Sequence, residues 1–151
     1  MSARQVTTDD IARAVFVAAE EDGEPVPDLQ SRRLVAEIEA LTGARKIQGF
    51  ATATADDGGR FVVAVIGEEA YLLRFNEGVL RVTFLGNLPG LHYEEHLKAI
   101  GAIRGFAGEA WVRLELAHER LPGRLTIEAE DWSVSLLEGL RESFRSWAAR
   151  S

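Results

Sequence analysis

The sequence predicts an α+β fold in which an antiparallel sheet is combined with two N-terminal helices and a C-terminal amphipathic helix. Three observations predict it. Apolar residues recur at helical spacing near both ends of the chain, the spacing changes to alternation from Lys46 onward, and short turns separate the alternating segments. Strands joined by short turns pair antiparallel, so we expect a four-strand meander, then a helix, then a two-strand hairpin.

Two helices are expected before the sheet. The run from Thr7 to Asp10 supplies capping hydroxyls and first-turn carboxylates, and apolar residues at helical spacing follow it, which predicts a helix over residues 9–20. The segment EDGEPVPDLQ ends this helix. Asp28 follows a proline and can cap a second helix, which Gly43 ends. The apolar stripe of the second helix consists of Leu34, Ile38 and Leu41.

The meander is expected to run from Lys46 to Leu85. Its strands are IQGFATATA, RFVVAVIG, YLLRF and VLRVTFL, and the turns DDGG and NEG separate the first from the second and the third from the fourth. The second strand is apolar on both faces, which predicts a central position with cover on each side. In the fourth strand, Leu80, Val82 and Phe84 share one face, and Arg81 and Thr83 take the other.

A third helix is expected between the meander and the hairpin. It follows the breaker NLPG at 87–90 and ends near Gly105, with Tyr93, Leu97, Ile100 and Ile103 as its apolar positions. The hairpin is formed by AWVRLELAHER and RLTIEAE around the turn Leu121-Pro122-Gly123.

The last helix begins at a capping box formed by Ser135 and Glu138. Its apolar face is expected to bury Leu136, Leu137, Leu140, Phe144 and Trp147. The opposite face carries Glu138, Arg141, Glu142 and Arg145.

Composition limits the domain organisation and the class of partner. The 151 residues are 46% hydrophobic, which predicts one domain, 1–151, with the N-terminal helix and linker over 1–27 as a peripheral addition. The formal net charge of −7 is unfavourable for binding to nucleic acids and to anionic lipid surfaces. The absence of cysteine excludes disulfides and thiolate chemistry. With neither a secretory signal nor a membrane-spanning segment in the sequence, we expect a cytoplasmic protein without membrane or nucleic-acid partners.

The sharpest chemical motif is LHYEEHL at 91–97, in which His92, Glu95 and His96 spell the H-x-x-E-H arrangement of some zinc proteases. The proteases with this motif take a third ligand from a glutamate far downstream, and only 55 residues follow His96 here. A smaller zinc site could instead recruit His118, whose strand parity matches Leu114 and Leu116. The alternative is that the histidines sit at the edge of an apolar core.

We expect no catalytic residues and no cofactor, with zinc at the three histidines as the alternative. The glycines at 101, 105 and 108 are not followed by Gly-Lys-Ser/Thr, and the chain has no G-x-S-x-G elbow. Trp111 is more informative, because alternation places it on the outward face of its strand with Arg113 and Glu115. An outward aromatic residue indicates a surface that meets another protein, unless a helix of the same chain covers it.

The C-terminal half resembles the type III secretion chaperone-like fold, including its YbjN-like relatives. The residues that carry the resemblance are LRVTFLGNLP and the final segment GRLTIEAEDWSVSLLEGLRESFRSWAAR, and the likeness covers roughly residues 34–149. It implies a small acidic non-enzyme that dimerises and holds a partner polypeptide on exposed apolar surface. The middle helix near Leu97, Ile100 and Ile103 would contribute to the dimer.

These observations favour a non-enzymatic protein-binding module of the chaperone or adaptor type, a homodimer whose partner surface is formed by Leu97, Ile100, Ile103 and Trp111. Two alternatives stay open. One is a small metal-binding enzyme or sensor centred on His92, His96 and His118. The other is a helix-capped barrel of the pleckstrin-homology kind that binds a protein or a lipid headgroup, since a meander followed by an amphipathic helix would satisfy that fold as well.

Overall fold

The computed structural model describes residues 7–100, 109–130 and 137–150 of the chain. Within these residues, three helices and a seven-stranded antiparallel sheet confirm the predicted α+β class. The helices are α1 (Thr8–Glu21), α2 (Asp28–Thr42) and α4 (Glu138–Ala148). The strands are β1 (Ile47–Ala55), β2 (Arg60–Ile66), β3 (Glu69–Asn76), β4 (Val79–Gly86), β5 (His92–Ile100), β6 (Glu109–Ala117) and β7 (Leu125–Glu130).

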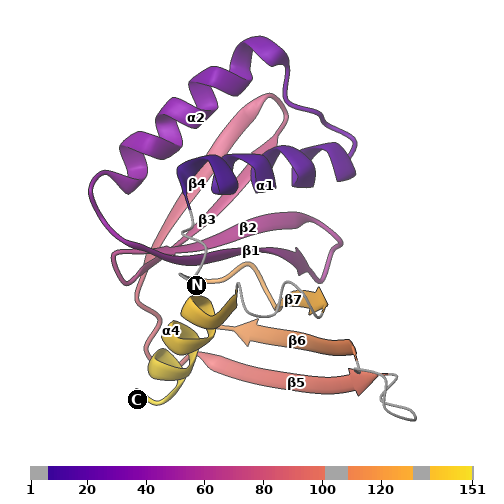
Figure 1. The fold of residues 1–151 in the computed structure, drawn as a ribbon, viewed down its shortest axis with the longest axis vertical. Helices are drawn as coiled ribbons and strands as arrows, with labels where there is room; N and C mark the ends of the chain where they lie inside the picture. Colours follow the sequence, from indigo (N-terminus) through magenta and orange to yellow (C-terminus); the bar gives the residue numbers. More distant parts are fainter. Residues whose placement is uncertain (1–6, 101–108, 131–136, 151) are drawn as a thin grey trace.

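The sheet consists of two meanders, β1 to β4 and β5 to β7, in the order β4-β3-β2-β1-β7-β6-β5. In the described part of the chain, the two meanders are joined by the pairing of β1 with β7, where Thr54 lies opposite Thr126 and Ala55 lies opposite Leu125. Because this pairing is confined to the end of β1, the other end of β1 is free to diverge from β7. Figure 1 shows α4 beside the two meanders there, and α1 and α2 over the four-strand meander.

Strand β2 is covered on both faces, as the apolar pattern of RFVVAVIG predicts. Val62, Ala64 and Ile66 of β2 belong to a core that α1 and α2 share. Val63 and Val65 face the other way, into a core formed with β1, β6, β7 and α4. All five side chains are buried, which confirms the central position of β2 in its meander.

The predicted middle helix is wrong, because residues 92–100 form strand β5, which pairs with β6 from His92 opposite Ala117 to Ile100 opposite Glu109. The two apolar residues Tyr93 and Leu97 fit both interpretations, since residues four apart share a face on a helix and also on a strand. Glu95 lies between them on the same face of the strand. A charged residue at an inward position hides the alternation that indicates a strand.

With β5 in place, the hairpin becomes a three-strand meander, and residues 92–100, which the resemblance to secretion chaperones places in a middle helix, form a strand. The described elements are two helices, two meanders and a C-terminal helix, in that order.

The N-terminal helices are part of the folded core. Thr7 caps α1 in a capping box with Asp10, as predicted, and Ile11 and Val15 are fully buried. Helix α1 of the predicted N-terminal addition therefore packs into the core. In α2, Pro27 is the N-cap and Asp28 is the first helical residue. Asp28 therefore does not cap the helix as predicted, but its carboxylate interacts favourably with the positive end of the helix dipole. Ser135, the predicted cap of the last helix, lies outside the described residues.

No helix among the described residues is long and apolar enough to cross a membrane.

Candidate functional site

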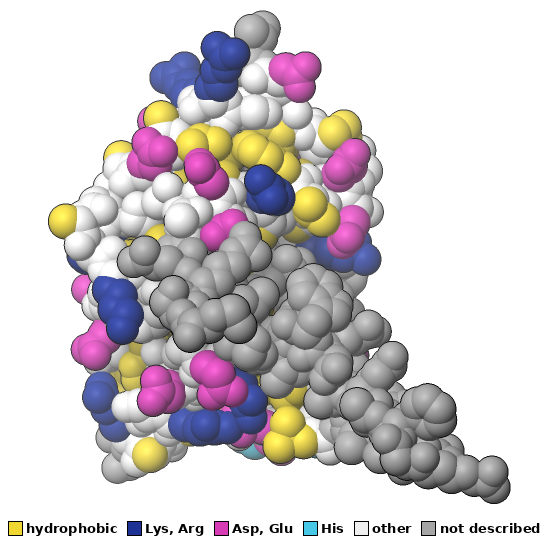
Figure 2. Space-filling view, viewed as in Figure 1, with side chains coloured by type: hydrophobic (Ala, Val, Ile, Leu, Met, Phe, Trp, Pro, Cys, Tyr) yellow, Lys and Arg dark blue, Asp and Glu magenta, His cyan; other side chains and the backbone are white. Residues whose placement is uncertain are grey.

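An apolar groove lies between α2 and strand β4. Its volume is about 450 Å³, and its lining is mostly aliphatic and aromatic. The lining residues are Glu37, Ile38, Ala40, Leu41, Leu80, Val82 and Phe84. The three β4 residues are those that strand alternation placed on one face, so this part of the prediction is confirmed. Figure 2 shows hydrophobic side chains, with charged ones around them, on the part of the molecule where α1 and α2 lie.

The groove runs along an edge of the sheet, because β4 is the last strand on its side. An edge strand presents backbone N–H and C=O groups that can pair with another chain. Phe84 is 69% exposed there and packs edge-on against the ring of Tyr71, at a centroid distance of 5.3 Å. The Tyr71 hydroxyl accepts a hydrogen bond from Arg45 and donates one to Glu69, which fixes the ring beneath Phe84.

The second candidate site is a cluster of ion-pairing side chains on β5 and β6. His96 Nε2 lies 3.4 Å from Glu94 Oε2 and 3.4 Å from Glu115 Oε2. His92 Nε2 lies 3.4 Å from the other oxygen of Glu94. Since Glu94 of β5 lies directly opposite Glu115 of β6, two carboxylates are neighbours on adjacent strands. The hydrogen bond with His96 is the chief cause that lowers the pKa of Glu94.

His118 is not part of this cluster. Its Nδ1 accepts a hydrogen bond from the Arg120 backbone N–H at 3.1 Å, so Nε2 carries the proton and donates to the Pro89 carbonyl, also at 3.1 Å. Arg113 lies opposite His96, and His118 follows it by five residues, a separation of about 17 Å along a strand. The structure therefore brings His92 and His96 to one carboxylate and leaves His118 apart from them.

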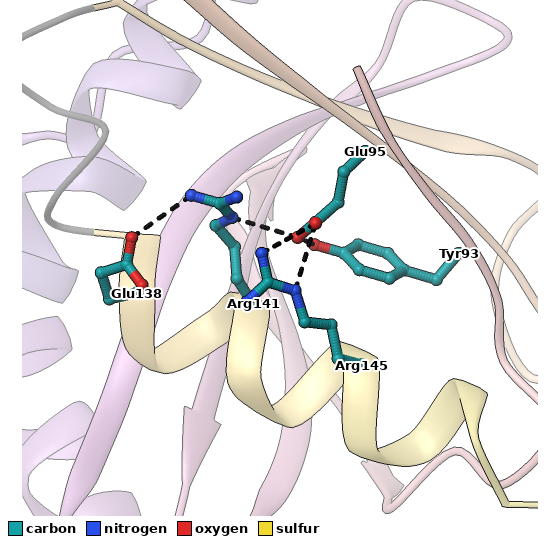
Figure 3. Close-up of polar contacts among 5 residues, drawn as sticks. All are labelled: Tyr93, Glu95, Glu138, Arg141 and Arg145. Atoms are coloured by element: carbon teal, nitrogen blue, oxygen red, sulfur yellow. Dashed lines mark hydrogen bonds and ion pairs between the residues drawn. The ribbon is translucent and has the colours of Figure 1, made fainter. Parts of the chain in front are cut away.

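The inward face of β5 holds a partly buried ion-pair network with α4 (Figure 3). Glu95 accepts hydrogen bonds from Arg141 Nε at 3.0 Å, from Arg145 Nη2 at 2.8 Å and from the Tyr93 hydroxyl. Arg141 also donates to Glu138 at 3.2 Å. The Arg141 side chain is only 8% exposed, although the helical pattern placed it on the outer face of the last helix. This network fixes α4 against the edge strand, which is a structural role.

The network also changes the acid–base behaviour of its members. Burial alone would raise the pKa of Glu95, but the hydrogen bonds from Arg145, Arg141 and Tyr93 outweigh it and lower the pKa from 4.5 to about 2. Burial, together with the hydrogen bond to Glu95, raises the pKa of Tyr93 far above its usual value.

We expect a pH dependence of stability that follows from the lowered pKa of Glu95. Its folded-state pKa lies below the unfolded value, so its stabilising contribution is complete above about pH 4.5 and is lost as the pH falls toward about 2. Urea unfolding at about pH 5 and about pH 3 should show a smaller loss of stability for Glu95→Gln than for the wild type. Equal losses in the two proteins would contradict the assignment.

The predicted partner surface is only partly described. Leu97 lies on β5 and is 68% exposed, so one of its four residues is an exposed apolar side chain. Ile100 and Trp111 lie in β5 and β6, with side chains outside the described part. Ile103 lies outside the described residues altogether. Leu97, Ile100 and Trp111 belong to strands, so Leu97 and Ile100 do not lie on the helical stripe that we expected.

Sequence reasoning missed the network and the groove. A signal for the network existed, because Arg141 and Arg145 are four residues apart in the last helix and Glu95 interrupts an apolar alternation. No local signal marked the groove, since α2 and β4 are separated by about forty residues and only the tertiary structure places them together.

Comparisons of the chain with family models, with curated proteins and with solved structures returned no match.

Proposed function

We propose that this protein is a non-enzymatic protein-binding module that takes an extended apolar segment of another polypeptide at strand β4. The observation that carries the proposal is the apolar groove between α2 and β4, with Phe84 exposed at its rim. A segment that adds to β4 as a new strand would pair with its backbone and place alternate side chains in the groove. Backbone pairing supplies affinity and the groove supplies selectivity for apolar residues.

The chemistry of the groove favours a polypeptide over the lipid headgroup of the helix-capped alternative. Its one charged lining residue is Glu37, which repels phosphate, and the whole chain carries a net charge of −7. The aliphatic residues of the lining instead gain free energy when a partner removes them from water. The other edge of the sheet, β5, carries charged side chains along its length, which discourages strand pairing there.

Homodimerisation through the region of Leu97 is the second part of the proposal. It derives from the chaperone resemblance, and the exposure of Leu97 on the edge strand β5 supports it. Sedimentation equilibrium of the full chain tests it. We expect a dimer that Leu97→Ser converts to monomer, and a monomeric wild type would contradict it.

Peptide selection tests the main proposal. Random twelve-residue peptides displayed on phage are selected on the immobilised full chain, and selected peptides are measured by fluorescence anisotropy. We expect sequences with alternating apolar residues. Phe84→Ser should weaken their binding by about tenfold or more, since a buried Phe side chain contributes about 1.5–3 kcal/mol.

Val17→Ser is the control, because Val17 is an exposed apolar residue of α1 that does not line the groove. It should leave peptide affinity unchanged. If no peptide is enriched, or if Phe84→Ser and Val17→Ser bind the selected peptides equally, the groove does not have this function.

A further inference from the structure

We infer that Glu94, His96 and Glu115 form a binding site for a divalent transition-metal ion of the zinc type. The site lies on β5 and β6, at the opposite edge of the sheet from the groove, and is independent of the function proposed above. One ligand atom from each residue lies within 4.8 Å of the other two. This grouping differs from the three histidines suggested by the sequence, because carboxylates replace His92 and His118.

The distances fit a tetrahedral ion. Ligand atoms at about 2.1 Å from zinc in a tetrahedron lie about 3.4 Å from one another. Both distances from His96 Nε2 to the glutamate oxygens are 3.4 Å. The two glutamate oxygens lie within 4.8 Å of each other, so their approach to one ion is the movement that binding requires. Three protein ligands leave a fourth position for water.

The electrostatics of the strand pair independently favour a cation. Glu94 and Glu115 are directly opposite each other, and like charges in that arrangement are destabilising. Among the described side chains, the ionisable groups beside this pair include His92, Arg113 and Glu128. Arg113 Nη2 lies 3.5 Å from the second oxygen of Glu115 and Arg113 Nε lies 3.9 Å from Glu128, so this one arginine is shared between two carboxylates.

The type of ligand selects the class of ion. Imidazole nitrogen with carboxylate oxygen suits zinc and its neighbours, whereas calcium and magnesium prefer sites made only of oxygen. His92 reaches the other oxygen of Glu94 and so occupies the place of a residue that orients a ligand. The strands supply rigidity, because Glu94 and His96 are two residues apart on one strand and Glu115 lies on its paired neighbour.

Titration of the full chain with zinc chloride in phosphate-free buffer tests the site. We expect one zinc ion per chain by isothermal titration calorimetry. With zinc at about one hundred times its dissociation constant, the melting temperature should rise by roughly 5–10 °C. His96→Gln and Glu115→Gln should each raise the dissociation constant at least about tenfold. Circular dichroism establishes that both variants are folded.

His118→Gln is the matched control, because both ring nitrogens of His118 are already engaged by backbone groups. This variant should bind zinc as the wild type does. The inference is overturned if the wild type binds no zinc at millimolar concentration, if His96→Gln and Glu115→Gln bind as tightly as the wild type, or if His118→Gln loses binding.

Discussion

Gly139→Ala should destabilise the protein by about 2 kcal/mol or more, although alanine is a better helix former than glycine by about 1 kcal/mol. Gly139 lies in the first turn of α4, against the backbone of β1. A Cβ atom at this position would overlap the carbonyl oxygen of Gln48 and lie 2.8 Å from its carbonyl carbon. Because backbone cannot rotate away as a side chain does, α4 must shift from the sheet.

Urea unfolding measures this effect, and Ser146→Ala is the control for helix propensity. Ser146 is an exposed residue of the same helix, so its substitution changes the propensity without a clash. We expect Ser146→Ala to be neutral or slightly stabilising. If Gly139→Ala also raises the free energy of unfolding, α4 does not approach the backbone of β1 as closely as described.

Glu95→Ala should cost about 3 kcal/mol of unfolding free energy, because it leaves a buried guanidinium without its main partner. Among the described residues, the Arg141 side chain then keeps its ion pair with the exposed carboxylate of Glu138 alone. Arg145 and Tyr93 lose their contacts with Glu95 in the same step. The loss is larger than for a surface ion pair, whose removal costs about 1 kcal/mol or less.

Glu94→Ala is the matched control for this prediction, because Glu94 is adjacent on β5 but contacts half-exposed histidines on the other face. With a chelator present to exclude metal effects, we expect a cost below about 1 kcal/mol. Equal costs for Glu94→Ala and Glu95→Ala would mean that α4 does not depend on the network.

The two proposed sites are expected to behave independently. The groove lies at the β4 edge and the carboxylate–histidine cluster at the β5–β6 edge, and four strands lie between β4 and β6 in the sheet order. Substitutions this far apart, without shared partners, usually have additive effects. Peptide affinity should therefore be the same with and without zinc, and a change in affinity would indicate an additional contact between the two sites.

The sequence alone determined the elements whose local residue pattern is enough to predict which side chains are buried. Strand β2 is apolar on both faces and is buried on both, and α1 begins at the capping box that its first residues indicate. Strand β4 places Leu80, Val82 and Phe84 on one face, as alternation requires. In each of these cases the signal is local, because hydrogen bonds of the turn or the pleat of the strand fix which side chains share a face.

Only the tertiary structure decided the elements whose residues depend on distant partners. Residues 92–100 became a strand because β6 pairs with them and because two arginines of α4 neutralise Glu95 on the inward face. Because residues 92–100 form a strand, His96 lies beside Glu94 and Glu115 instead of beside His118. His118 is bonded to backbone groups elsewhere. A buried charge is tolerated when a residue of opposite charge from another part of the chain pairs with it. The spacing of residues within one segment cannot predict that partner.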